Sequence, residues 1–333
     1  MVNIKGIKGN LHLLMILGAW YISNGTTILL NKYIFQAMLF QFPITLTFIH
    51  MTMQSGLAFV TIVIFGLIEK TPIPTDVYFK RMIPISFFFC ANILLGNVSL
   101  RYVPVSFMQT LKSLTPVFAA VLQYLCFGSR LSAQAAVSLL PATLGVALSA
   151  YTELSFNLIG FVSAILSCLF TGLKFVLSFA LLRGQYNLDA INMLLYMAPP
   201  SVLILFPSAF WFESTGVMAW LKAPDRTEKD LAVLLFSAIV SFSLNATLFM
   251  VIKATSSVTA TIAGNLKTLV VIIISIIIFK NPVQFWNYVG MIAALAGITW
   301  YGMIKNKWQT TGTSEISEGS QTESEQIKRE AAA

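Results

Sequence analysis

The sequence predicts an all-α integral membrane protein, with ten transmembrane helices arranged as two inverted repeats of five. Three observations support this prediction. Of the 333 residues, 57% are hydrophobic and only 10% are charged, whereas a soluble domain carries about 25% charged residues. The apolar residues form repeated runs of about 20, which matches the thickness of a hydrocarbon core and exceeds the length of a β-barrel strand. The second half of the chain also echoes the first.

The apolar runs give the expected helices in chain order, because each run is bounded by polar or charged residues. They cover residues 11–34, 43–68, 82–102, 104–127, 132–151, 156–182, 189–212, 230–253, 257–279 and 283–304. The first run is too long for the core of a signal peptide, and no small-residue cleavage site follows it. Residues 1–10 are expected to form a cytosolic N-terminus, and the polar residues 305–333 a disordered cytosolic tail.

The basic residues predict how the helices are oriented in the membrane. An even number of helices places both termini on one side. Most lysines and arginines outside the apolar runs, such as Lys70, Lys80 and Arg130, fall on that side, so the positive-inside rule makes the termini cytosolic. The formal charge of +8 reflects these helix ends, and no nucleic-acid partner is expected. No transit segment precedes the first run, which favours the secretory pathway over a plastid or mitochondrion.

An internal repeat relates the two halves of the chain. The segments "LKSLTPVF" and "LKTLVVII" can be aligned so that Lys112 pairs with Lys267 at an offset of 155. After a gap of about one helical turn, Gly145 pairs with Gly297 at an offset of 152. The two expected blocks are residues 11–151 and 152–304. Because five is odd, the blocks would insert with opposite topology, as in secondary transporters whose substrate site lies between the halves near the membrane midplane.

Three lysines fall inside the expected spans, where no carboxylate is expected. They are Lys112, Lys174 and Lys267, whereas all 13 acidic residues are placed at helix ends, in loops or in the tail. A charge at the centre of a membrane helix costs about 2.5–3.5 kcal/mol on insertion scales. The sequence therefore predicts that the charge of these cations is balanced by a group that is not part of the chain. The predicted group is an anionic substrate in a water-filled cavity. For Lys174, an alternative is that the long side chain extends to the interface, and a structural role remains open for all three.

Polar side chains recur at helical spacing near these lysines. Asn24, Thr27 and Asn31 form a stripe on the first helix that leads to Lys32, although Lys32 alone would suit an interfacial anchor. The other candidate polar residues are Gln109, Thr115, Thr171, Ser178, Asn97 and Asn245. Any one stripe is more often a helix-packing device than a binding site. If the stripes face one cavity, they would form a binding chamber.

Gly264 and Thr268 flank Lys267 in the ninth expected helix. A glycine one turn away lets a ligand or another backbone approach closely, and the threonine supplies a hydroxyl beside the ammonium group. Together these groups are able to hold a phosphate by charge and hydrogen bonds. The spacing is not that of a Walker loop.

No enzyme, metal site or cofactor is expected. The three cysteines lie in apolar runs and are typical of small core residues. Neither His12 nor His50 has a carboxylate beside it, and the spacing of the polar residues matches neither a catalytic triad nor a set of metal ligands.

Three segments of the sequence resemble a known family. They are "NKYIF" at the end of the first helix, "VSFMQTLKSLTPVF" in the fourth and "GNLKTLVVIIISIIIF" in the ninth. The chain is similar, over residues 11 to about 305, to the triose-phosphate translocator and nucleotide-sugar transporter family of the drug/metabolite transporter superfamily. In the plastid sugar-phosphate members, lysines ending the first helix and in the fourth, with a Lys-Arg pair in the ninth, clamp the phosphate. The resemblance implies this role for Lys32, Lys112 and Lys267.

Four positions depart from the sugar-phosphate members. Their arginine is Thr268 here, and helper histidine, threonine and tyrosine residues fall at Ile93, Gly96 and Leu244. The Lys-Thr pair instead resembles the Lys-Thr group, whose members move UDP-sugars into the Golgi lumen, usually against a nucleoside monophosphate. The Gly-Ala-Leu-Asn-Lys string of GDP-mannose carriers is absent from this sequence.

The resemblance thus implies a Golgi antiporter that exchanges a nucleotide sugar, most simply a UDP-sugar, for a nucleoside monophosphate. A sugar-phosphate or phosphoenolpyruvate/phosphate translocator is the alternative function, and the endoplasmic reticulum is the alternative location. The expected partners are a phosphorylated anion and the lipid bilayer, and a homodimer remains open. A proton-coupled exporter of cations would need a carboxylate in the membrane, and none is expected there.

Overall fold

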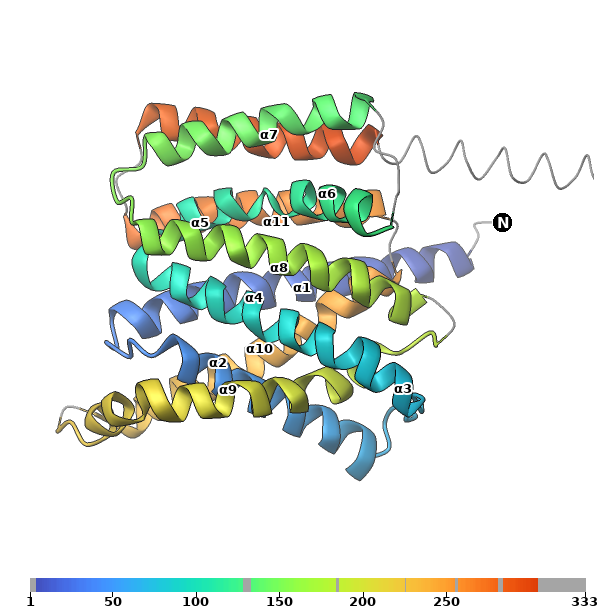
Figure 1. The fold of residues 1–333 in the computed structure, drawn as a ribbon, viewed down its shortest axis with the longest axis vertical. Helices are drawn as coiled ribbons and strands as arrows, with labels where there is room; N and C mark the ends of the chain where they lie inside the picture. The colour runs from blue at the N-terminus through green and yellow to red at the C-terminus, as the bar shows by residue number, and fades with distance from the viewer. Residues whose placement is uncertain are drawn as a thin grey trace, which may run out of the picture.

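The computed structural model describes residues 4–127, 133–183, 186–224, 226–254, 257–280 and 284–304. Within these ranges the regular structure is entirely helical, and the helices lie side by side along one direction (Figure 1). They are α1 (Ile4–Gln36), α2 (Pro43–Phe59), α3 (Thr75–Val77), α4 (Ile83–Tyr102), α5 (Val105–Lys112), α6 (Thr115–Phe127), α7 (Ala133–Tyr151), α8 (Leu158–Arg183), α9 (Ala190–Leu221), α10 (Glu228–Ala254) and α11 (Ser257–Phe279). A C-terminal helix follows at Phe285–Ile304. The π-helical turns η1 (Val60–Ile64) and η2 (Tyr78–Met82) extend α2 and join α3 to α4.

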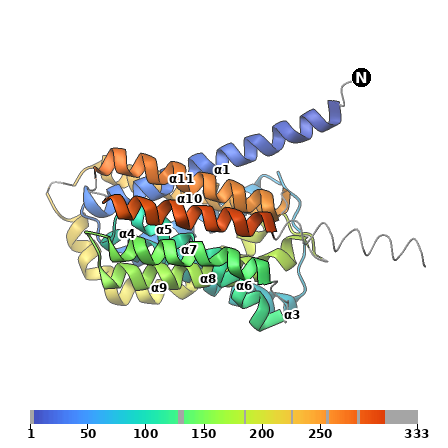
Figure 2. The same ribbon diagram turned by 90° about the horizontal axis from the view of Figure 1, so that it is seen from above.

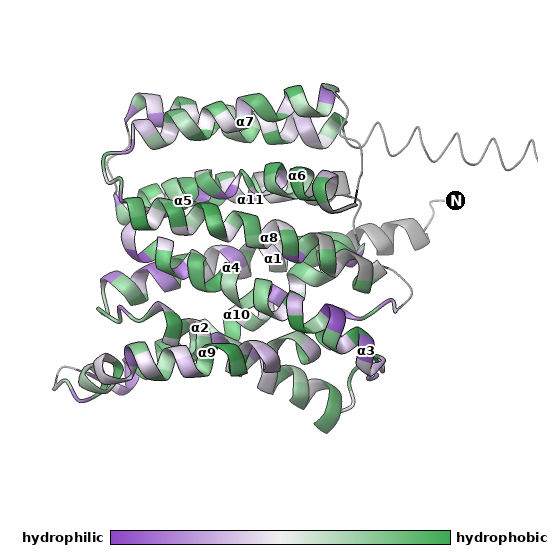
Figure 3. Cartoon of the chain, viewed as in Figure 1, coloured by the Kyte–Doolittle hydropathy of each residue, from purple (hydrophilic) through white to green (hydrophobic). Residues whose placement is uncertain are grey.

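The length and hydropathy of these helices confirm the membrane class. In the described part of the chain, nine helices are long and apolar enough to cross a bilayer, and α11 adds the shorter apolar stretch Leu266–Phe279. Hydrophobic residues cover most of the helix lengths, and hydrophilic ones gather mainly toward the ends of the bundle (Figure 3). The N-terminal end of α1 extends beyond the other helices (Figure 2). The expected total of ten spans stays a prediction. The expected tail, residues 305–333, lies outside the described residues.

The fourth expected span is present as one apolar stretch, Val105–Leu122, but the prediction of a continuous helix over 104–127 was wrong, because a turn at 113–114 interrupts it. Helix α5 ends at Lys112 and α6 begins at Thr115. The intervening turn tightens through hydrogen bonds from Ser113 N to Thr110 O (3.1 Å) and from Leu114 N to Leu111 O (3.0 Å). The sequence contains a reason for the break. Pro116 has no N–H group to donate to the carbonyl of Lys112 four residues earlier.

The two halves of the chain pack together through contacts between corresponding helices. The first half comprises α1, α2, α4, α5 with α6, and α7, and the second comprises α8 to α11 and the C-terminal helix. The first helix of each half packs against the third helix of the other, α1 on α10 and α8 on α4. The second helices, α2 and α9, pack together, and so do α5 and α11. A two-fold relation between inverted halves would produce this pattern of helix contacts. The pattern supports the expected repeat without establishing it.

Close glycine contacts join α7 to the C-terminal helix, which form one layer in Figure 1. A Cβ atom at Gly145 would lie 2.5 Å from the backbone N of Ala294, and one at Gly297 would lie 2.5 Å from that of Ala142. With the sequence offset of 152, Gly145 corresponds to Gly297 and Ala142 corresponds to Ala294. The two contacts are therefore equivalent under the expected repeat.

Candidate anion-binding site

Lys112 is the last residue of α5 and lies at the break in the fourth span. Its Nζ atom is 3.4 Å from the position that a Cβ atom would take at Gly96 of α4, and the hydroxyl of Ser167 in α8 is 3.5 Å from the same point. The absence of a side chain at Gly96 therefore makes room for the ammonium group. The carbonyl end of a helix also favours a cation, so the break in the span contributes to stabilising Lys112.

Lys174 of α8 is enclosed by aromatic rings. Its Nζ atom lies 5.1 Å from the ring centroid of Phe89, 5.3 Å from that of Phe175 and 5.9 Å from that of Phe249. The side chain is only 3% exposed, so the alternative that Lys174 extends to the membrane interface is wrong. Cation–π attraction partly compensates for the lost hydration of the ammonium group.

Lys267 of α11 lies against the first helix. Its Nζ atom is 4.6 Å from the centroid of the Trp20 ring. A Cβ atom at Gly264 would be 3.9 Å from the Cη2 atom of Trp20, an ordinary van der Waals distance, so α11 faces this indole at Gly264. The Thr268 hydroxyl donates to the Gly264 carbonyl at 2.9 Å, and in this conformation its proton is used within its own helix.

The three ammonium groups converge from both halves of the chain. Lys112, Lys174 and Lys267 lie within electrostatic range of one another: Lys267 interacts with both of the others, and Lys174 interacts with Lys112. Within the described residues, none of the three forms a hydrogen bond or an ion pair. The structure therefore brings together three cations whose charge no described neighbour balances.

Lys32, the fourth lysine expected at the site, is engaged elsewhere in this conformation. Its Nζ atom donates to the carbonyls of Leu100 and Val103, both at 2.7 Å. These groups belong to the end of α4, so Lys32 satisfies carbonyls that lack partners within the helix. Its contact with a substrate stays a prediction.

The two expected amides also form internal contacts. Asn97 accepts from Asn31 and donates to Thr47, both at 2.9 Å, and so joins α4 to α1 and α2. Asn245 donates to the Ser241 carbonyl of its own helix at 3.0 Å. These bonds fit the helix-packing alternative, and a binding role for either amide stays a prediction.

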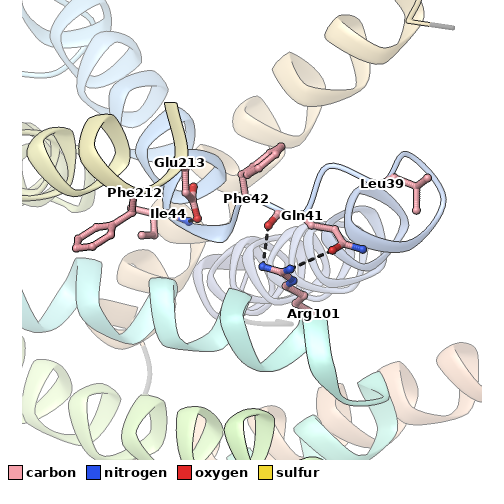
Figure 4. A pocket seen from close by; sticks show the side chains of 7 residues that line it. All are labelled: Leu39, Gln41, Phe42, Ile44, Arg101, Phe212 and Glu213. Carbon is pink, nitrogen blue, oxygen red and sulfur yellow. Dashed lines mark hydrogen bonds between the residues drawn. The ribbon is translucent and has the colours of Figure 1, made fainter. Parts of the chain in front are cut away.

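A surface cavity of about 530 Å³ lies at the end of the bundle opposite the N-terminus (Figure 4). Its lining residues are Leu39, Gln41, Phe42, Ile44, Arg101, Phe212 and Glu213. It is not lined by Lys112, Lys174 or Lys267. The Arg101 guanidinium donates to the backbone carbonyl (2.9 Å) and the side-chain oxygen (3.0 Å) of Gln41. This cavity is therefore distinct from the lysine cluster.

Glu213 corrects the expectation that every carboxylate lies at or beyond a helix end. It lies inside α9, which continues to Leu221 rather than ending at 212. Its carboxylate accepts hydrogen bonds from Ile44 N (3.1 Å), Thr45 N (2.7 Å) and the Thr45 hydroxyl (2.8 Å). It thus satisfies the first N–H groups of α2, which explains how an acid is accommodated within a long apolar helix.

The aromatic neighbours of the lysines were not expected from the sequence. Trp20 lies four residues before Asn24 and extends the Asn24–Thr27–Asn31 stripe by one turn, which was a usable signal. Phe89 and Phe249 come from separate helices in a chain with 26 phenylalanines. No local pattern distinguishes them.

The fold and this cluster define a class of protein: a helical membrane protein that holds cations at the meeting of its two halves. Comparison with known families makes this specific. The chain belongs to the Triose-phosphate Transporter family, whose model matches residues 11–302. This confirms the resemblance seen in the sequence, and it confirms a transporter rather than an enzyme.

Curated relatives cover most of the chain. A UDP-galactose transporter of Arabidopsis thaliana is 40% identical over 86% of this chain and 85% of its own length. A GDP-mannose transporter of the same plant is 41% identical over 86% of this chain and 84% of its own. A probable sugar phosphate/phosphate translocator, also from this plant, is 34% identical over 90% of this chain and 97% of its own. A solved crystal structure matches the fold with a TM-score of 0.51 at 13% identity, over 87% of this chain and 99% of that chain.

Proposed function

We propose that this protein is a secretory-pathway antiporter that exchanges a nucleotide sugar for a nucleoside monophosphate by alternating access. The observation that carries the proposal is the cluster of Lys112, Lys174 and Lys267, which has no balancing charge among the described residues. A phosphorylated anion would supply that charge. The UDP-galactose and GDP-mannose transporters among the relatives favour a nucleotide sugar over a sugar phosphate.

Lys112 and Lys267 bind the diphosphate from opposite halves of the chain, and Lys174 adds a third positive charge. Gly264 and Thr268 shape the pocket beside Lys267. Two observations support this assignment: the electrostatic interaction among the ammonium groups and the position of the Lys112 Nζ atom beside Gly96, where there is no side chain. The ligand also contacts Lys32, Asn97 and Asn245 on its way through the opening.

Obligatory exchange follows from the electrostatics of the cluster. An empty site leaves cations without a counter-charge in a low-dielectric environment, and this disfavours the occluded state through which the carrier must pass. A bound anion removes the penalty, so that the loaded carrier crosses readily and the empty one does not. Exchange then requires an anion in each direction.

Counterflow in proteoliposomes tests this assignment. Lys112→Gln and Lys267→Gln are each expected to lower exchange at least about tenfold, since each removes a charged hydrogen bond to phosphate of about 1.5–3 kcal/mol. Lys70→Gln is the control, because Lys70 is an exposed lysine in the segment after η1. Wild-type exchange rates in either site variant would contradict the assignment.

A substrate panel separates the nucleotide-sugar function from the alternative. UDP-sugars, GDP-mannose, triose phosphate and phosphoenolpyruvate are offered as counter-substrates, with UMP, GMP and inorganic phosphate as competitors. We expect a UDP-sugar to exchange fastest, with UMP as the strongest competitor. Preferential exchange of triose phosphate or phosphoenolpyruvate, with inhibition by free phosphate, would instead establish the sugar-phosphate translocator.

The proposed location is the Golgi membrane, with both chain termini in the cytosol. The basic residues at the expected cytosolic helix ends support this orientation. Epitope tags at either end should be digested by protease added to intact Golgi vesicles. Protection of both tags would indicate that the termini face the lumen. Recovery of the protein in the endoplasmic reticulum would favour the alternative location.

A further inference from the structure

Trp20 is a buried aromatic residue with two properties that helix packing does not explain. Its side chain is 6% exposed, and its Nε1 atom is buried without a hydrogen-bond partner among the described residues. Its ring also lies 4.6 Å from the Nζ atom of Lys267. An indole N–H is a donor only, and leaving such a donor buried and unpaired costs free energy. Burial of this unpaired N–H therefore calls for an explanation.

Neighbouring residues already anchor this part of α1. The Tyr21 hydroxyl donates to the Ala263 carbonyl at 2.5 Å, and the hydroxyls of Ser23 and Ser243 are hydrogen-bonded at 2.9 Å. These bonds fix α1 to α11 and α10 without using the indole N–H. One turn beyond Trp20, the Oδ1 atom of Asn24 is likewise buried and has no partner in the part of the chain that the structure describes. Trp20 Nε1 and Asn24 Oδ1 thus lie on the same stripe of α1, which begins at the residue that contacts Lys267.

The immediate surroundings of Lys267 show what the N–H group is able to do. A phosphate has several oxygens to satisfy, and the Thr268 hydroxyl, which is adjacent to Lys267, uses its proton on the Gly264 carbonyl. Trp20 is a direct neighbour of this ammonium group and has an unused N–H. Its face attracts the cation, while its edge offers a neutral donor to an anion bound there.

We propose that Trp20 is a further positioning residue of the anion site: its ring holds the Lys267 ammonium group in the empty site, and its N–H donates to a phosphate oxygen of the bound nucleotide. This inference rests on the proposed function and adds to it a residue of the first helix. Contact with the ring also explains how the Lys267 side chain stays directed toward the site when no counter-charge is bound. The bound anion then replaces the ring as the main partner of the ammonium group.

Two substitutions separate the roles of the ring and the N–H group. Trp20→Phe keeps an aromatic face for Lys267 and removes the donor, whereas Trp20→Leu removes both. Tyr21→Phe is the matched control, because it removes a hydrogen bond from the same contact between α1 and α11 without touching Lys267. The probes are UMP and GMP, measured as half-saturation concentration and maximal rate of counterflow. Melting temperatures with and without each nucleotide provide a second measurement that needs no transport.

We expect Trp20→Phe to raise the half-saturation concentration about fivefold to tenfold, as for loss of one hydrogen bond to a charged group, with the maximal rate within about twofold. Trp20→Leu should raise it further and also reduce the rate, because Lys267 loses its partner in the empty carrier. Tyr21→Phe should shift the melting temperature alone. In the binding measurement, Trp20→Phe should reduce the stabilisation by nucleotide without lowering the melting temperature of the empty protein by more than Tyr21→Phe does.

The outcomes distinguish this inference from the function on which it rests. Unchanged half-saturation and unchanged nucleotide stabilisation in Trp20→Phe overturn the donor role while leaving wild-type exchange, and hence the proposed function, intact. Equal losses in Trp20→Phe and Tyr21→Phe assign Trp20 to packing and overturn the inference. Failure of the wild-type protein to bind or exchange either nucleotide overturns both together.

Discussion

Each of the buried ammonium groups is stabilised by a neighbour that carries no negative charge. Lys112 lies at the carbonyl end of α5, Lys174 lies among phenyl rings and Lys267 lies over an indole. Dipoles and aromatic faces offset part of the cost of burying a cation, but a phosphate would offset much more. These neighbours therefore keep the lysines in place and leave them available to a stronger partner.

Removing a buried charge should stabilise the empty carrier while impairing transport. Lys174→Met keeps a long unbranched side chain among the rings of Phe89, Phe175 and Phe249 and eliminates the ammonium group. We expect it to raise the free energy of unfolding by about 1–3 kcal/mol, since an isolated charge is costly in a membrane interior. Exchange should fall at the same time.

The measurement is the melting temperature of purified protein without nucleotide, alongside counterflow. Lys229→Met serves as the control, because Lys229 is an exposed lysine in the first turn of α10 and should change neither quantity appreciably. An unchanged or lower melting temperature in Lys174→Met would show that the ring contacts already compensate fully for the charge.

The second prediction at the scale of a residue concerns substitutions at Gly96. A Cβ atom there would lie 3.4 Å from the Lys112 Nζ atom, so an alanine should be tolerated by a small movement of the flexible lysine. The branched side chain of Gly96→Val should displace the ammonium group and lower counterflow about tenfold or more, the size expected for loss of a charged contact. In the control, Gly56→Val, a Cβ atom would meet nothing within 4 Å. Full activity in Gly96→Val would place the substrate away from Lys112.

At the scale of elements, the broken fourth span positions Lys112. The sequence supplied the apolar runs, the lysines and the glycines, and these were sufficient to predict most helices and the resemblance to a family. It did not reveal the break, because proline alone is ambiguous: α9 continues through Pro199, Pro200 and Pro207. Nor did it reveal the rings around Lys174, since contacts between separate helices leave no local pattern. Glu213 was misplaced because its partners lie in α2.

Pro116 provides a test of the break. Pro116→Ala restores an N–H group that is able to donate to the carbonyl of Lys112, so the helix should become continuous and more stable by about 1–3 kcal/mol. The ammonium group of Lys112 should then be carried away from Gly96. We expect a higher melting temperature together with slower counterflow.

Pro141→Ala is the matched control, because Pro141 lies inside α7, which is continuous, and it has no part in the lysine cluster. A variant of Pro116 that transports at the wild-type rate would show that the break is not needed for function. Equal slowing in the two variants would point to a general effect of proline on helix movement.

At the scale of the whole molecule, the contacts between the two halves are those expected of inverted repeats. The first helix of each half lies on the third helix of the other, and each half contributes to the lysine cluster, Lys112 from one and Lys174 with Lys267 from the other. A substrate between them would contact both halves at once. Rocking of one half against the other would then change the access to the site without dismantling it.

The contacts between α7 and the C-terminal helix test this symmetry directly. A Cβ atom at Gly145 or at Gly297 would lie 2.5 Å from a backbone nitrogen of the facing helix, so in either position the two helices must separate. Because the contacts are equivalent under the expected repeat, Gly145→Ala and Gly297→Ala should destabilise the protein by similar amounts, about 1–3 kcal/mol each as for an overpacked core. The double variant should cost less than the sum, since one separation relieves both overlaps. Gly18→Ala, where nothing lies within 4 Å, should leave the melting temperature unchanged or slightly higher. A large loss in one glycine variant and none in the other would show that the halves do not share this contact.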